Sequence, residues 1–361
     1  MRHYRIVLLP GDGIGHDVIA EGMKTLNHLA ELRGDFTLET QQFDWSCTYY
    51  LQHGEMMPKD ALKTLTEFDA IYLGAVGFPS VPDHVSLWGM LLPIRQTYDL
   101  YVNLRPARLL PGIQGPLRDR GPEDINIICV RENTEGEYAG VGGRTHRGRP
   151  WEVAQQTGVF TRHAIERIMR YSFDLARREG RQKVTSATKS NAQQYSYVLW
   201  DEVHAQVAAE YPDIQTDKWH IDALAARFVT HPHTLDVVVG SNLFGDILTD
   251  LGGALMGSLG LPPSANLNPD PGTRHGPAMF EPVHGSAPDI AGKGIANPLA
   301  TFWAGQMMLD YLGEREAGQT LMRAIETVTA AGKVRTPDLG GQATTWEMGD
   351  AVRDALTRLH S

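Results

Sequence analysis

The sequence has little cysteine and no long apolar run. Its 361 residues include two cysteines, Cys47 and Cys129, which lie far apart and outside any CxxC or Cys/His spacing. This pattern argues against a disulfide framework or a zinc site and favours a reducing compartment. The apolar stretch at residues 6–10 is too short for the core of a signal peptide, and no later run approaches a membrane span. We therefore expect a cytoplasmic protein without membrane contacts.

An excess of basic residues is also absent. The chain has 33 Lys and Arg against 43 Asp and Glu, a formal net charge of −10. This balance argues against a nucleic acid or an anionic membrane as partner. A small acidic metabolite is a different case, because a few arginines are enough to bind it locally. The 42% hydrophobic and 21% charged content is ordinary for a globular protein, and the length allows two domains.

Apolar runs alternate with helical patterns, which is typical of an α/β protein. The first strand is expected at residues 5–9, followed by a helix with apolar residues from Ile19 to Ala30 at helical spacing. Further strands are expected at residues 70–76, 125–130, 184–188 and 236–239, and helices at about 193–210, 298–312, 316–331 and 346–359. No repeat or polar linker separates two halves, so two domains would share the chain by crossing over.

The glycine-rich turn at residues 11–15 follows the first strand, but it does not fit a Rossmann fingerprint. Its spacing is GxGxG, without the third glycine at the required offset, and no acid at a strand end follows about 20 residues later. A tight strand-to-helix turn is the simpler interpretation.

Two acids, Asp246 and Asp250, follow an apolar strand at helical i, i+4 spacing, which places both carboxylates on one face of a helix. Oxygen ligands suit a hard divalent cation such as Mg²⁺ or Mn²⁺. On these two residues alone, acids that complement a helix dipole are the simpler explanation. Both acids also come soon after a strand, which is where open α/β sheets bind ligands, and this position strengthens the case for a metal site.

Three arginines, Arg95, Arg105 and Arg131, are candidates for binding carboxylates, because guanidinium groups hold them in bidentate pairs. Taken singly, each is more simply explained as a surface ion-pair partner. Arg131 is harder to explain in that way, since it directly follows the strongly apolar strand expected at 125–130.

Proton transfer has two candidates, Tyr138 and Lys189, and Lys189 ends an expected strand. A lysine that acts as a base near neutral pH needs a pKa well below its usual value of about 10.4, and a solvated lysine is the simpler alternative. Asp222 is an acid within a mainly apolar stretch, so it needs a partner or a metal ion.

Residues 280–297 form a Gly- and Pro-rich segment that allows a ligand to approach the backbone closely at 285–287. Asp289 is suited to accept hydrogen bonds from a ribose 2′-hydroxyl and to repel a 2′-phosphate. A surface loop explains the composition equally well.

Together these segments resemble the β-decarboxylating dehydrogenases that act on isopropylmalate, isocitrate, tartrate and D-malate. The resemblance runs from LPGDGIG at 9–15 to GGQATT at 340–345. Between them lie NLRP at 103–106, VRENTEGEY at 130–138, TKSN at 188–191, GDILTDL at 245–251 and EPVHGSAPDIAG at 281–292. Because all of these motifs occur together and in this order, the simpler explanations given above for the single groups of residues no longer account for the sequence.

The resemblance implies an α/β, two-domain isocitrate/isopropylmalate dehydrogenase-like fold and a homodimer with shared active sites. Residues 1–100 with 256–361 would bind the cofactor, and residues 101–255 would carry the substrate, the metal and the dimer contacts. The cofactors would be NAD and Mg²⁺ or Mn²⁺, with a monovalent cation such as K⁺ left open.

The resemblance also assigns roles to single residues. Lys189 would handle the hydroxyl proton and Tyr138 would protonate the enol, while Lys189 and Asp222 would reach in from the neighbouring subunit. The remaining roles are as follows: substrate binding by Arg95, Arg105, Arg131, Trp88 and Leu91; metal binding by Asp222, Asp246 and Asp250; cofactor binding by Ile14, His284, Gly285, Ser286, Ala287, Asp289 and Asn297.

The expected substrate follows from Trp88. In the isopropylmalate enzymes of the family, an acidic residue occupies this position. An indole there would fill the space for a C3 substituent and leave room for hydrogen or hydroxyl. D-malate is therefore expected, with tartrate as the alternative and isopropylmalate after it. The loop at 268–277 departs from the family pattern, because it is a few residues longer than usual. Two other functions fit the sequence less well. A non-catalytic subunit of the same fold should lack some of the metal-binding or proton-transfer residues, and none of them is missing. A metal-dependent hydrolase would not need residues 284–297, which match the adenosine-binding segment of the family.

Overall fold

The computed structural model describes residues 1–360, which divide into two compact units. Unit 1 contains residues 1–100, 109–122 and the described residues from 253 onwards, and unit 2 contains residues 101–108 and 123–252. The chain therefore crosses between units, and residues 109–122 group with unit 1. None of the helices in residues 1–360 has both the length and the apolar character needed to cross a membrane. The assignment of cofactor and substrate binding to separate domains remains a prediction.

Unit 1 is built on a sheet with the strand order β2-β1-β3-β12-β11. The strand β1 pairs in parallel with β2 and β3, and β12 pairs in parallel with β3 and antiparallel with β11. Residues of β1 and β3 pack with Met90 and Ile94 in one apolar core. The strands are β1 (Arg2–Gly11), β2 (Phe36–Gln42), β3 (Ala70–Ala75), β11 (Pro263–Leu267) and β12 (Ala278–Pro282).

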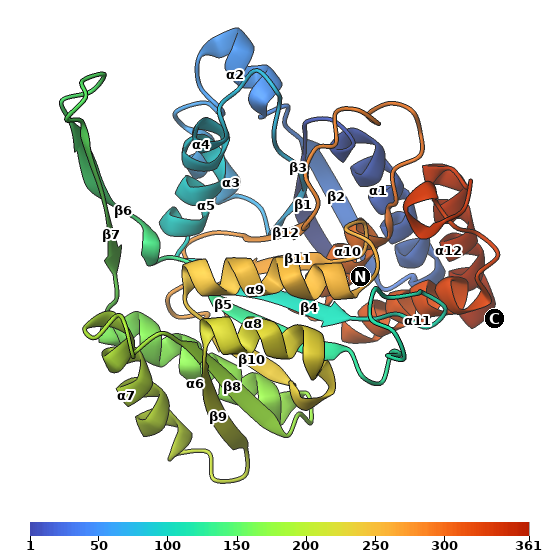
Figure 1. The fold of residues 1–361 in the computed structure, drawn as a ribbon. Coiled ribbons are helices and arrows are strands. Elements are labelled where there is room, and N and C mark those ends of the chain that lie inside the picture. The colour runs from blue at the N-terminus through green and yellow to red at the C-terminus, as the bar shows by residue number, and fades with distance from the viewer. Residues whose placement is uncertain (361) are drawn as a thin grey trace. The chain divides into compact units, whose positions relative to one another are not determined.

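The helices of unit 1 include a group in which α10 contacts α1 and α11, and α12 contacts α1 and α11 (Figure 1). The helix α1 ends at Gly34, whose positive φ of 68° allows its N–H to bond Ala30 O. The helical segments are α1 (Gly15–Arg33), α2 (Cys47–His53), α3 (Ala61–Leu65), α4 (Asp83–Ser86), η1 (Leu87–Leu91), α5 (Leu92–Thr97), α10 (Leu299–Tyr311), α11 (Arg315–Ala331), η3 (Pro337–Leu339) and α12 (Thr345–His360).

Unit 2 has the strand order β4-β5-β10-β8-β9. The strands β4 and β5 pair antiparallel, and the other neighbours are parallel. A separate antiparallel ribbon of β6 and β7 extends away from α6 and α7 (Figure 1). The strands are β4 (Val102–Arg108), β5 (Asn126–Glu132), β6 (Gly136–Thr145), β7 (Val153–Val159), β8 (Lys183–Thr188), β9 (Gln215–His220) and β10 (Val237–Gly240).

The helices of unit 2 alternate with its strands along the chain, and polar residues lie near the points where strands end and helices begin. The helix α6 starts at Thr161, whose side chain accepts a hydrogen bond from Ala164 N at 3.1 Å. The helix α9 starts two residues after β10 and carries the two acids at i, i+4 spacing. The helical segments are α6 (Arg162–Arg178), α7 (Ser196–Ala208), α8 (Ile221–Thr230), η2 (Pro232–Thr234) and α9 (Asn242–Leu255).

The expected alternation of strands and helices is confirmed. The strands expected at 5–9, 70–76, 125–130, 184–188 and 236–239 correspond to β1, β3, β5, β8 and β10, with ends that differ by up to three residues. The expected placement of Arg131 after its strand is wrong, because β5 continues through Glu132. Parallel pairing of β10 with β5 extends the ladder to Arg131. The structure also contains α6 and the β6–β7 ribbon, which the apolar periodicity did not indicate.

Candidate active site

Asp246 and Asp250 lie on α9, and Arg105 on β4 approaches both carboxylates. Arg105 Nη1 is 3.9 Å from Asp246 Oδ1 and 3.5 Å from Asp250 Oδ1, and it donates to Thr249 Oγ1 at 2.8 Å. Burial raises the pKa of Asp250, and the Asp246 charge adds to the rise, whereas Arg105 and Arg131 oppose it. Two neighbouring hard oxygen donors of this kind suit a divalent cation.

Asp222 lies apart from this pair. Its Oδ1 accepts a hydrogen bond from Lys189 Nζ at 2.5 Å, and its side chain is 67% exposed. The Lys189 hydrogen bond holds the pKa of Asp222 below its usual range. Across residues 1–360, the structure brings together no group of three or more His, Cys, Asp or Glu side chains that could hold a metal ion. Of the three expected metal ligands, one chain therefore brings only Asp246 and Asp250 close together.

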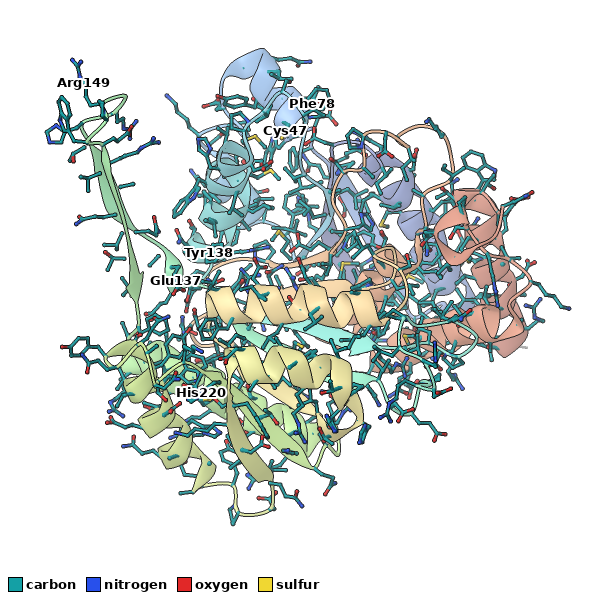
Figure 2. The ribbon with its side chains drawn as sticks, in the orientation of Figure 1. Cys47, Phe78, Glu137, Tyr138, Arg149 and His220 are labelled. Carbon is teal, nitrogen blue, oxygen red and sulfur yellow. The ribbon has the colours of Figure 1, made fainter. Side chains whose placement is uncertain are left out.

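Arg131 and Tyr138 both bind Asp246. Arg131 Nη1 donates to Asp246 Oδ1, and the Tyr138 hydroxyl donates to Asp246 Oδ2 at 3.0 Å. The guanidinium carbon also lies 5.3 Å from the centre of the Tyr138 ring. Tyr138 lies near the base of the β6–β7 ribbon, and Arg149 marks its far end (Figure 2). The Asp246 carboxylate thus contacts both a candidate anion-binding group, Arg131, and a candidate proton donor, Tyr138.

Arg95 belongs to unit 1, where it is buried against Glu281. Its Nη2 donates to Glu281 Oε1 at 3.0 Å, and its Nε has no hydrogen-bond partner among the described residues. A buried guanidinium with an unsatisfied N–H is suited to an anionic ligand. This observation is compatible with the expected substrate role of Arg95.

Trp88 and Leu91 lie in η1, a π-helical turn between α4 and α5. Leu92 N–H bonds Leu87 O, five residues back. Pro93 explains this widening, because it has no N–H to donate to Gly89 O and its ring would clash with that carbonyl in an α-helix. The Trp88 side chain is 41% exposed and Leu91 is partly buried. Isolated π-turns are frequent at functional sites.

The expected cofactor segment packs on the start of α1. Ile14 N donates to Ser286 O at 2.8 Å, and a Cβ on Gly13 would lie 1.9 Å from the same oxygen. Only glycine is therefore compatible with this close approach. Ile14 is 5% exposed and packs with Ala287, so its side chain serves the loop's packing.

Three positions in this segment, His284, Gly285 and Asp289, remain suited to a ligand. His284 Nε2 is buried without a hydrogen-bond partner among residues 1–360, and burial lowers the pKa of His284. The space around a Cβ on Gly285 is open, and Asp289 is exposed. Asn297 differs: its Oδ1 accepts from Leu299 N at 3.0 Å and its Nδ2 donates to Asp338 at 2.9 Å. Asn297 thus fixes the start of α10 through these bonds.

Several residues with structural importance for the site were not identified from the sequence. Asp12 Oδ2 accepts bonds from Cys47 N and Gly77 N, at 3.0 and 3.1 Å, so it ties the glycine-rich turn to two other loops. The sign of this role in the sequence was an acidic residue placed between Gly11 and Gly13. Asp338 receives bonds from Ser258, Thr336 and Asn297, which no local pattern predicts. Asn242, three residues before the GDILTDL motif, was likewise not identified.

The chain is similar over nearly its whole length to several decarboxylating dehydrogenases. The chain is 53% identical over 356 residues to a probable tartrate dehydrogenase/decarboxylase of Agrobacterium vitis, covering 99% of this chain and 98% of the relative. It is 53% identical over 365 residues to the decarboxylating D-malate dehydrogenase of Escherichia coli K12, covering 99% and 100%. For the tartrate dehydrogenase/decarboxylase of Pseudomonas putida the identity is 51% over 364 residues, covering 99% and 98%.

A solved structure is similar over the same extent. Isocitrate dehydrogenase from Methylococcus capsulatus has a TM-score of 0.86 and 36% identity, covering 98% of this chain and 99% of that chain. The isocitrate/isopropylmalate dehydrogenase family matches residues 5–352. The close relatives are decarboxylating dehydrogenases, which are oxidoreductases. The expected fold, distinct from a Rossmann fold, is confirmed, and the chain belongs to the isocitrate/isopropylmalate dehydrogenase family.

Proposed function

We propose that the protein oxidises D-malate with NAD and decarboxylates the product to pyruvate and CO₂. The observation that carries the proposal is the contact of Asp246 with both Arg131 and Tyr138. It gathers a metal-binding carboxylate, a cation for a substrate carboxylate and a phenol for proton transfer. Tartrate is the second candidate, because relatives that are 51–53% identical carry that substrate in their names.

The metal would be Mg²⁺ or Mn²⁺, held by Asp246 and Asp250. Dehydrogenases of this family generally use NAD and a divalent metal ion. A bound divalent ion supplies Lewis acidity for the 2-oxygen during oxidation and for the carbonyl during loss of CO₂. Because one chain contributes only this pair, we assign the third ligand to Asp222 of a second copy. A monovalent cation such as K⁺ is a further candidate cofactor.

The chain's own residues then bind the diacid and move its protons. Arg95, Arg105 and Arg131 hold its carboxylates through charge-assisted hydrogen bonds. Lys189 of the second copy takes the proton of the 2-hydroxyl as hydride leaves for NAD. Tyr138 donates its phenolic proton to the carbon that loses CO₂. Trp88 and Leu91 form the wall beside C3.

NAD would bind along residues 284–297, with Ile14 and the 285–287 backbone beneath it. The orphaned His284 Nε2 and the open space at Gly285 support this assignment. Asp289 would accept hydrogen bonds from the ribose. The homodimer that follows from sharing Lys189 and Asp222 would work in the cytoplasm, which is compatible with the free, buried Cys47 and Cys129. Neither a nucleic acid nor a membrane is a proposed partner.

A substrate panel tests the proposal. NAD⁺ reduction is followed with D-malate, tartrate, isopropylmalate and isocitrate, with Mg²⁺ or Mn²⁺ and with excess chelator. We expect kcat/KM to be highest for D-malate, lower for tartrate and poor for the other two acids. Chelator or Asp246→Asn should abolish turnover. A preference for isopropylmalate would reject the substrate assignment, and full activity in chelator would reject the metal.

Subunit sharing has its own test. Lys189→Ala and Tyr138→Phe variants should each be inactive, since each lacks one proton-transfer group. Mixing them should restore part of the activity, because a hybrid dimer contains one site with both native groups. Exchange of subunits is verified separately with distinguishable tags. Exchange without recovered activity would show that each chain builds its site alone.

A further inference from the structure

Asn242 is the first residue of α9 and lies one helical turn before Asp246. It is 1% exposed, and its side chain uses both of its polar ends. Its Oδ1 accepts hydrogen bonds from Arg131 Nε at 2.9 Å and from Arg131 Nη2 at 2.7 Å. Its Nδ2 donates to the backbone carbonyl of Glu135 at 3.0 Å. The residue therefore links α9, β5 and the turn before β6.

These bonds fix the orientation of the Arg131 guanidinium. Because the group is a rigid planar fork, two bonds along one edge leave it little freedom to rotate. Its other nitrogen, Nη1, is then directed to Asp246. Gly245 permits this approach, since a Cβ there would lie 2.6 Å from Arg131 Cβ and Cγ. The arginine is thus packed and bonded along most of its length.

The same amide holds the segment that leads to Tyr138. Glu135 lies three residues before Tyr138, and its carbonyl is fixed by Asn242. Gly136 lies close as well, because a Cβ on it would be 3.3 Å from Asn242 Cβ. On the other side of this turn, Glu132 accepts bonds from Thr134 N and Glu135 N at 3.0 and 2.9 Å. The turn is therefore clamped from both sides.

We propose that Asn242 is a positioning residue that sets Arg131 for the substrate carboxylate and aligns it with Tyr138. This inference rests on the proposed role of Arg131 in substrate binding. A neutral amide is suited to the task, because it accepts two guanidinium hydrogen bonds without neutralising the positive charge. A carboxylate at this position would make stronger bonds and compete with the substrate for that charge.

The test compares Asn242→Ala with Ser241→Ala. Ser241 is the preceding residue, 2% exposed, and its Oγ shares a hydrogen bond of 2.6 Å with the Tyr197 hydroxyl. Both variants therefore lose a buried hydrogen bond at the start of α9, but only Asn242→Ala releases Arg131. We expect Asn242→Ala to raise KM and the calorimetric Kd for the diacid by at least about tenfold. Ser241→Ala should change the KM and Kd for the diacid by less than about twofold. The KM for NAD should stay unchanged in both variants.

An isosteric variant separates positioning from folding. Asn242→Asp keeps the acceptor for Arg131 but loses the donor to the Glu135 carbonyl, so a thermal denaturation curve with a single cooperative transition is required first to show that it folds. Its negative charge should nevertheless weaken diacid binding by about tenfold. Parent-like diacid affinity in Asn242→Asp would overturn the argument for a neutral residue.

A double-mutant cycle decides whether Asn242 acts through Arg131. Arg131→Lys removes the planar fork, so adding Asn242→Ala to it should raise Kd by less than about twofold further. A further tenfold rise would show that Asn242 acts independently and would overturn the proposal. The cycle uses whichever of the four acids the parent oxidises best. If that acid is neither D-malate nor tartrate, the proposed function fails, while the cycle still tests Asn242.

Discussion

Arg95 and Glu281 form a buried ion pair in unit 1. Arg95 Nη2 and Glu281 Oε1 are 3.0 Å apart, and the side chains are 7% and 9% exposed. Asn266 Nδ2 donates to the same Glu281 oxygen at 2.9 Å. The carboxylate therefore compensates a guanidinium that has little access to water. Removing one partner of such a pair leaves the other charge buried and unpaired.

We expect Glu281→Ala to lower the free energy of unfolding by about 3–5 kcal/mol, as measured by chemical denaturation. Glu281→Gln should lower it less, because its carbonyl still accepts the bonds from Arg95 and Asn266. Glu316→Ala is the control, since Glu316 is 80% exposed in its pair with Arg33, and such a pair contributes about 0–1 kcal/mol. Equal losses for Glu281→Ala and Glu316→Ala would contradict a stabilising role for the buried pair.

His204 on α7 should make stability depend on pH. Its Nε2 lies 2.8 Å from Thr216 Oγ1, and burial lowers its pKa to about 4, with the Asp201 charge opposing the shift. In the unfolded chain a histidine pKa is about 6.5. Below that pH the unfolded chain binds a proton that the folded protein excludes. The His204 contribution is therefore complete above pH 6.5 and is lost as the pH falls towards about 4.

The full loss is about 3 kcal/mol by linkage. The free energy of unfolding is measured between pH 7 and pH 4 for the parent and for His204→Gln. The variant should lose less stability than the parent over this interval, because glutamine does not titrate. His146→Gln, at an exposed position in the β6–β7 connection, should follow the parent. Parallel curves for His204→Gln and the parent would show that His204 does not cause the dependence.

Half of the strands of the large sheet could be predicted from the sequence, namely β1, β3, β5, β8 and β10, together with the long helices α1, α7, α10, α11 and α12. Buried strands such as β3 and β10 are short apolar runs, and α1 shows regular spacing of Ile19, Met23 and Leu26. The pair Asp246 and Asp250 was also predictable, because helical spacing alone places both on one face. Local rules were sufficient wherever a residue's position depends on its own element.

Other features depend on contacts that local patterns do not contain. The ribbon of β6 and β7 is mostly exposed, so it lacks the apolar alternation of a packed strand. The amide of Asn242 became meaningful only when β5 placed Arg131 beside α9. The π-turn at Leu87–Leu91 also went unpredicted, although Pro93 inside a helical segment was its visible sign.

Asp289 should determine the choice between NAD and NADP. It is exposed on a loop that Gly292 N ties to Asp17 Oδ2 at 3.2 Å, so the backbone beside it is held to α1. A carboxylate near a 2′-phosphate repels it, and about 1.4 kcal/mol of repulsion after solvent screening corresponds to a tenfold preference. We expect the parent to favour NAD by at least that factor in kcat/KM.

Asp289→Lys should shift this ratio towards NADP, and Asp289→Asn should shift it less. Asp17→Asn is a matched control, because it changes the loop's anchor without removing the charge at Asp289. Equal kcat/KM for both cofactors in the parent would refute the role of Asp289. A large shift in Asp17→Asn alone would assign the preference to loop position instead.

Trp88 and Pro93 should together determine which acids enter the proposed C3 pocket. Trp88→Ala removes a bulky wall, so kcat/KM for isopropylmalate should rise relative to D-malate, since overpacking no longer excludes the larger group. Trp346→Ala is the control, because Trp346 is 50% exposed on α12 and has no assigned substrate role. It should leave the ratio unchanged.

Pro93→Ala tests the turn itself. Alanine restores an N–H that can bond Gly89 O, so the helix can close by one residue and rotate Trp88 by roughly 100° relative to Arg95. We expect the ratio of kcat/KM for isopropylmalate and D-malate to move in the same direction as in Trp88→Ala. The thermal midpoint should not fall, because alanine favours the helix. A changed ratio in Trp88→Ala with none in Pro93→Ala would show that the indole acts without the π-turn, and no change in either would remove Trp88 from the pocket.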